Sequence, residues 1–157
     1  MKIAIGADHR GYNAKVSIHA LLQDKGQEVI DYGTDSTKSM DYPDPAFAAS
    51  KAVQDGECEL GILLCGTGIG MSITANKLHG IRAAVCHDEL TAEMARQHNN
   101  ANVLCLPADL VGDALMRRIV EVWLGTSYEG GRHERRVQKI TEIEKAQCNL
   151  LKEKGEG

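Results

Sequence analysis

Five short aliphatic runs divide the chain, and they constrain its fold more than any other feature. They occupy residues 2–7, 28–33, 60–65, 81–86 and 102–107, with sequences such as KIAIGA and LGILLC. Most are continuously apolar, as expected of parallel strands covered on both faces by helices. The segments between and after them predict helices over residues 12–25, from 43 onward, 72–77, 88–98, 111–124 and 133–151. The pattern predicts a Rossmann-like, three-layer α/β sandwich around a five-stranded parallel sheet.

Length and charge limit the kinds of partner. At 157 residues the chain fits a single domain, 1–157, with a C-terminal helical extension from about residue 128. A net charge of -4 gives no electrostatic reason to expect nucleic acid or an anionic membrane as a partner. No apolar run approaches the roughly 20 residues that span a bilayer, and the N-terminal residues turn polar too early for a signal peptide. We therefore expect a cytoplasmic protein that binds a small molecule.

The cysteines fit this expectation. They are scattered and form no CxxC pair, the pattern that would indicate zinc or a redox couple. Reduced thiols in a reducing compartment are the simplest interpretation. A reactive cysteine must then be recognised by its surroundings. The five are Cys58, Cys65, Cys86, Cys105 and Cys148.

The stretch ILLCGTGIGMS, residues 62–72, provides such surroundings for Cys65. Glycines at 66, 68 and 70 allow positive φ angles, so that successive N–H groups can converge on an anion. The helix expected after them would point its positive end at the same place. Both features favour the thiolate, which can act as a nucleophile or as a base. Spacing alone does not separate these two roles.

Two simpler interpretations of the glycines exist. A dinucleotide-binding GxGxxG motif would need glycine at Met71, and no acidic residue follows about 20 positions later in the usual place. A purely structural glycine turn is more plausible, but it does not account for the cysteine that precedes it.

Open parallel sheets bind ligands at the carboxyl ends of their strands. At the predicted ends we find polar and reactive side chains close to the aliphatic runs. They are Asp8, His9, Tyr42, Cys65, His87 and Asp109. We expect the chemistry at this edge, with His87 only at its rim.

Five separated motifs, in this order and spacing, resemble the ribose-5-phosphate isomerase type B family. They are DHRGY, DYPD, CGTGIGMSITANK, RQHNNAN and YEGGRHERRV, and the match covers nearly the whole chain. The family also includes galactose-6-phosphate, allose-6-phosphate and erythrulose-phosphate isomerases. The resemblance implies an aldose–ketose isomerase that needs no metal or cofactor and forms a cis-enediolate.

The resemblance also implies roles for individual residues. Cys65 would be the base, Thr67 and His98 would open the sugar ring, and Asn99 would contact the enediol oxygens. Arg132 and Arg136 would bind phosphate, although arginines at a helix start oppose its macrodipole unless an anion binds there. The remaining implied substrate contacts are Asp8, His9, Tyr42, Gly66, Gly68, Ile69 and Gly70.

Family members form dimers or tetramers with shared sites. The C-terminal helix carries an apolar stripe that could dock on a second copy, or could instead cover the sheet of its own domain. The stripe consists of Val137, Ile140, Ile143 and Leu150.

One position departs from the family pattern. Where members commonly have a phosphate-binding arginine after the fifth strand, this chain has Asp109. We expect Asp109 to cap the following helix, and Arg10 or Arg135 to compensate for its charge. Three hypotheses stay open: isomerisation of ribose 5-phosphate, isomerisation of another sugar that need not be phosphorylated, and a non-catalytic sugar-phosphate or nucleotide-binding module.

Overall fold

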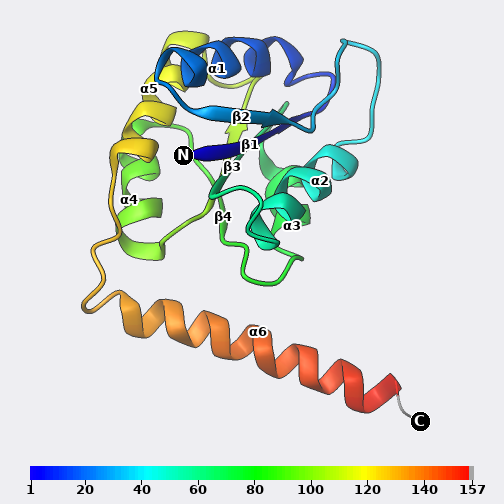
Figure 1. Ribbon diagram of the computed structural model, residues 1–157, viewed down its shortest axis with the longest axis vertical. Coiled ribbons are helices and arrows are strands. Elements are labelled where there is room, and N and C mark those ends of the chain that lie inside the picture. Colours follow the sequence, from blue (N-terminus) through cyan, green and yellow to red (C-terminus); the bar gives the residue numbers. More distant parts are fainter. Residues whose placement is uncertain (156–157) are drawn as a thin grey trace.

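The computed structural model describes the backbone of residues 1–155 and the side chains of residues 1–149. Within these residues, five parallel strands form one central sheet in the order β2-β1-β3-β5-β4 (Figure 1). The pairing sets Ala7 beside Leu64 and Cys65 beside Pro107, so the carboxyl ends of β1, β3 and β5 meet at one edge. The strands are β1 (Lys2–Ala7), β2 (Glu28–Asp31), β3 (Leu60–Cys65), β4 (Ala83–Val85) and β5 (Val103–Pro107).

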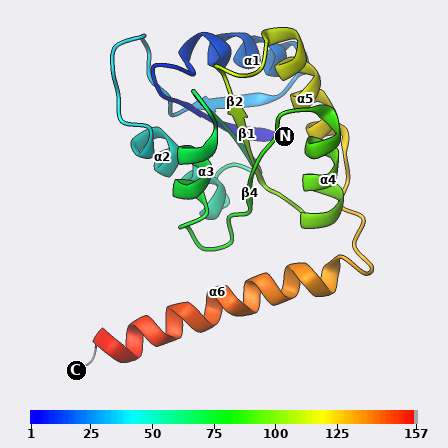
Figure 2. The ribbon, with the colours of Figure 1, turned by 180° about the vertical axis from the view of Figure 1, so that it is seen from behind.

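Helices cover both faces of this sheet (Figures 1 and 2). On one face lie α1 (Tyr12–Asp24), α4 (Glu89–Asn99) and α5 (Asp113–Gly125), and on the other lie α2 (Pro43–Gln54) and α3 (Ile69–Ala75). Each face has its own apolar core, built around Trp123 and Ile18 on the first and around Met71 and Ala46 on the second. The predicted single-domain, three-layer α/β fold is confirmed.

Some predicted boundaries are wrong. The helix expected from residue 72 begins at Ile69, because Gly68 adopts a left-handed φ of 74° and turns the chain directly into α3. The second and fourth strands are shorter than their apolar runs. The last helix, α6 (Glu134–Gly155), does not end at 151 but continues to Gly155.

Both views show α6 crossing outside the three layers (Figures 1 and 2). Val137 is buried, but Ile140 and Ile143 are 47% and 64% exposed, so the stripe does not cover the chain's own sheet. The side chain of Leu150 lies outside the described residues. Glu144 ties α6 to the domain, because it accepts a hydrogen bond from the Gly80 N–H (2.9 Å) and pairs with His79 (3.1 Å). In the described part of the chain, no helix is long and apolar enough to cross a membrane.

Candidate active site

Cys65 is the last residue of β3, and its thiol lies at the start of the glycine loop. The residue is only 5% exposed, and its Sγ accepts a hydrogen bond from the Gly68 N–H at 3.2 Å. The loop then enters α3, whose first intrahelical bond joins the Ser72 N–H to the Gly68 carbonyl (3.1 Å). The N–H groups of the first turn precede this bond and have no partner within the helix. A thiol and several backbone donors therefore share one small region.

Two glycines of this loop allow other side chains to come close. A Cβ on Gly70 would lie 2.6 Å from the ring of Tyr42, which rests against the first turn of α3. A Cβ on Gly66 would overlap the carboxylate of Asp109 and lie 2.9 Å from Arg10 Nε. Any larger residue at either position would push these side chains away from the loop.

The remaining glycine of the loop, Gly68, leads to a prediction about the stability of the fold. Gly68→Ala should lower the free energy of unfolding by about 1–2 kcal/mol, because an L side chain is disfavoured at positive φ. For a chain of this size the melting temperature should then fall by about 2–8 °C. Gly125→Ala is the matched control, because Gly125 lies in α5 with open space around it. Equal melting temperatures for the two variants would contradict the argument.

Three other cysteines are poor candidates for proton transfer at neutral pH. Burial raises the pKa of Cys86 to about 11, and burial also raises the pKa of Cys58 and of Cys105. These residues remain thiols and pack in the core. Among the four buried cysteines, Cys65 is distinguished by its position at the loop and its contact with the Gly68 N–H.

Asp8 and His9 follow β1 and adjoin the same edge. The buried carboxylate of Asp8 accepts hydrogen bonds from the N–H groups of Arg10 (2.9 Å) and Gly11 (3.0 Å), which fixes the turn. His9 Nδ1 accepts a hydrogen bond from the Met40 N–H at 3.2 Å. His9 thereby holds the loop that leads to Tyr42.

Asp109 does not cap a helix, so that prediction is wrong. Helix α5 begins after Gly112, at which no side-chain cap is formed. Instead the carboxylate of Asp109 forms an ion pair with Arg10 beside the glycine loop. Of the two arginines considered as compensation for its charge, Arg10 makes this contact.

The remaining predicted site residues lie at the opposite edge of the sheet. Helix α4 runs back antiparallel to the strands, so His98 and Asn99 at its end lie near the amino ends of β4 and β5. Arg82, just before β4, donates from Nε to the Asn99 carbonyl at 3.1 Å. The six residues of β3 alone separate the two edges by roughly 16–20 Å.

The predicted site thus falls into two groups within one chain. The carboxyl-edge group comprises Asp8, His9, Tyr42, Cys65, Gly66, Thr67, Gly68, Ile69 and Gly70. The amino-edge group comprises His98, Asn99, Arg132 and Arg136.

Two residues that sequence reasoning missed, Glu129 and His133, lie beside the amino-edge group. The rings of His98 and His133 stack at 4.1 Å, and Glu129 Oε2 lies 3.8 Å from His98 Nε2 and 3.6 Å from His133 Nε2. Burial lowers the pKa of His133, and the nearby His98 and arginines lower it further. His133 could have been found, because it lies inside the RHERR motif between the two chosen arginines.

His98, Glu129 and His133 offer three possible metal ligands within 4.8 Å of one another. However, the two imidazole rings are parallel to within 7°, so their lone pairs point in similar directions instead of converging on one ion. The arrangement is therefore poorly suited to holding a metal.

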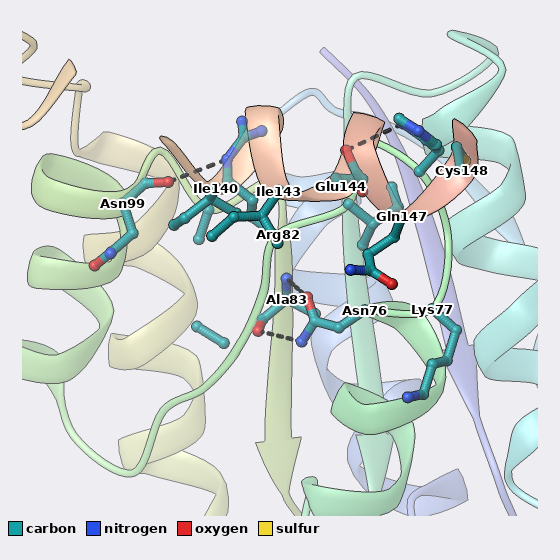
Figure 3. Close-up of a pocket in the computed structure, with 14 residues that line it drawn as sticks. Asn76, Lys77, Arg82, Ala83, Asn99, Ile140, Ile143, Glu144, Gln147 and Cys148 are labelled. Carbon is teal, nitrogen blue, oxygen red and sulfur yellow. Dashed lines mark hydrogen bonds and ion pairs between the residues drawn. The ribbon is translucent and has the colours of Figure 1, made fainter. Parts of the chain in front are cut away.

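A cavity of about 780 Å³ adjoins the amino-edge group (Figure 3). Ile140, Ile143 and Gln147 of α6 form one side of it, and Arg82, Asn76 and Asn99 come from the domain. The amide of Asn76 braces Ala83 by hydrogen bonds of 2.8 and 2.9 Å. The cavity opens between α6 and the domain, where apolar side chains of α6 are exposed.

The fold and the carboxyl edge define a class: an α/β domain with a buried thiol and backbone N–H donors together at the carboxyl ends of its strands. The comparisons agree, because the sequence pattern of the family described as Ribose/Galactose Isomerase matches residues 3–140. The chain belongs to this family and is a sugar-phosphate isomerase, which argues against a non-catalytic module.

Individual relatives are similar over nearly their whole length. The chain is 52% identical to ribose-5-phosphate isomerase B of Escherichia coli, covering 91% of this chain and 96% of that protein. It is 48% identical to D-erythrulose-4-phosphate isomerase of Pectobacterium atrosepticum, covering 89% and 93%. The solved structure of Clostridium thermocellum ribose-5-phosphate isomerase B superimposes with a TM-score of 0.92 at 52% identity, covering 94% and 99%.

Proposed function

We propose that this enzyme interconverts ribose 5-phosphate and ribulose 5-phosphate without a metal or other cofactor, in the cytoplasm. The observation that carries the proposal is the position of the Cys65 thiol. It accepts a hydrogen bond from the Gly68 N–H at the start of a loop of backbone donors. The 52% identity to a ribose-5-phosphate isomerase supports this substrate. The erythrulose-phosphate isomerase at 48% identity keeps a second sugar phosphate as the alternative.

In the proposed reaction the Cys65 thiolate removes the proton from carbon 2 of the open-chain aldose. The electron pair of that C–H bond forms the double bond between carbons 1 and 2, and the carbonyl oxygen becomes negatively charged. Backbone N–H groups of residues 66–70 stabilise this charge, and one such donor typically contributes about 3 kcal/mol. The hydroxyl proton on oxygen 2 passes to oxygen 1, the thiol returns its proton to carbon 1, and the electron pair left on oxygen 2 forms the carbonyl group at carbon 2, which gives the ketose.

The other groups prepare the substrate. Thr67 and His98 open the sugar ring, and Asn99 contacts the enediol oxygens. The side chains of Asp8 and Tyr42, and the backbone at Ile69, line the sugar. Arg132 and Arg136, together with His9, bind the phosphate through charge-assisted hydrogen bonds.

We further propose that two copies of the chain complete each site. Cys65 and His98 lie at opposite edges of one sheet, so one chain cannot bring both to the same sugar. In a two-fold dimer, the carboxyl-edge group of one copy would face the amino-edge group of the other. The exposed Ile140 and Ile143 of α6 would supply apolar area for this contact. A tetramer would repeat the same arrangement.

The test is proton exchange in deuterated water with a chelator present. We expect ribulose 5-phosphate to form from ribose 5-phosphate, deuterium to enter at the exchanging carbon, and the chelator to leave the rate unchanged. Erythrulose 4-phosphate and free ribose serve as competing substrates. A higher kcat/KM for erythrulose 4-phosphate would favour the alternative, and a rate abolished by the chelator would contradict the metal-free proposal.

A further inference from the structure

The ion pair between Arg10 and Asp109 lies directly beside the glycine loop. Arg10 follows β1 and Asp109 follows β5, the two strands that flank β3 in the sheet. The pair forms between Arg10 Nη2 and Asp109 Oδ2, and both side chains reach the position that a Cβ on Gly66 would occupy. The guanidinium group of Arg10 therefore lies beside Gly66, the residue that follows Cys65.

The backbone fixes both members of the pair. The Arg10 N–H donates to the buried carboxylate of Asp8 at 2.9 Å, and the Asp109 N–H donates to the Gly66 carbonyl at 3.0 Å. The side chains are 60% and 35% exposed. Exposed ion pairs contribute little to stability, so folding does not explain why this pair stands at the loop.

The charges at this edge matter for an anionic substrate. Asp8 and Asp109 bring two carboxylates close to the loop, and a phosphate dianion approaching them is repelled. Arg10 offsets this repulsion and has further N–H donors, since a guanidinium carries five. The planar fork of these donors fits two phosphate oxygens at once.

We propose that Arg10, oriented by Asp109, is a specificity-determining residue that binds the phosphate group of the substrate from the Cys65 side. The proposal rests on the proposed function, to which it adds a cation outside the amino-edge group. A sugar without phosphate gains nothing from Arg10, so the enzyme should select phosphorylated substrates.

The test compares Arg10→Ala with Arg118→Ala. Arg118 is a matched control, because it pairs with Glu89 at 2.7 Å with side-chain exposures of 58% and 38%, but lies on α5. For Arg10→Ala we expect KM for ribose 5-phosphate to rise about 10- to 100-fold with kcat little changed, as for loss of a charged hydrogen bond. The control should retain wild-type values. An unchanged KM in Arg10→Ala would overturn the proposal.

The double variant Arg10→Ala/Asp109→Asn separates binding by Arg10 from repulsion by an unpaired Asp109. If Arg10 binds phosphate, the double variant stays weak, whereas a return to the wild-type KM would overturn the proposal. Calorimetry with inorganic phosphate gives a readout that needs no turnover. A wild-type protein that binds phosphate through Arg10 but converts no ribose 5-phosphate would refute the proposed function alone.

Discussion

Replacing Cys65 with alanine should lower kcat for ribose 5-phosphate by about 10²–10⁴-fold, the usual contribution of a positioned acid or base. The variant should fold, because alanine is smaller than cysteine and fits the same buried position. KM should change little, since the thiol is proposed to move a proton and not to hold the sugar. Stopped assays of ribulose 5-phosphate formation would measure both constants.

Cys58→Ala is the control for this change. Cys58 is also buried, but it precedes β3 and lies at the opposite edge of the sheet. It should retain wild-type kcat. If Cys65→Ala kept more than about a tenth of the wild-type kcat, Cys65 would not be the general base, because such a base contributes at least about 10²-fold.

Mixing two inactive variants should restore activity. Cys65→Ala and His98→Ala each alter one group, and each should be about 10²-fold or more below wild type. In a two-fold dimer that contains one copy of each, one site has both groups intact and the other has neither. Random pairing makes half of the dimers mixed, so about a quarter of the wild-type activity should return. Co-refolding the variants and assaying the product would measure it.

The control mixture is Cys65→Ala with Thr67→Ala. Both residues belong to the carboxyl-edge group, so every site in every dimer keeps one altered residue and no activity should return. Rescue of this pair, or no rescue of the first, would contradict the shared site.

Much of the fold could be predicted because its three central strands, β1, β3 and β5, are apolar on both faces, as β3 shows with all six residues buried. The predicted ends of helices were wrong where the backbone conformation of single residues sets them. Gly68 and Gly70 indicate a loop by composition, yet α3 already begins at Ile69. Asp109 is a good capping residue, but its carboxylate is engaged by Arg10, a contact between two loops 99 positions apart in the sequence. No local pattern reveals such a contact.

The motifs identified the candidate site residues but not the division between the two groups. That division was implicit in the topology, since a helix that follows one parallel strand must return to the amino edge before the next begins. His98, at the end of α4, therefore could not lie beside Cys65 in the same chain. The stacking of His133 on His98 depends on how the segment after α5 folds back toward α4, which sequence spacing does not define.

The separation of α6 from the domain has a consequence for how the protein behaves in dilute solution. Its exposed Ile140 and Ile143 have little apolar surface of their own chain to cover them. When a folded chain is stabilised by association with another, mass action makes its apparent stability rise with protein concentration. Under the proposed association of two copies, the melting temperature and the specific activity should both decline as the sample is diluted.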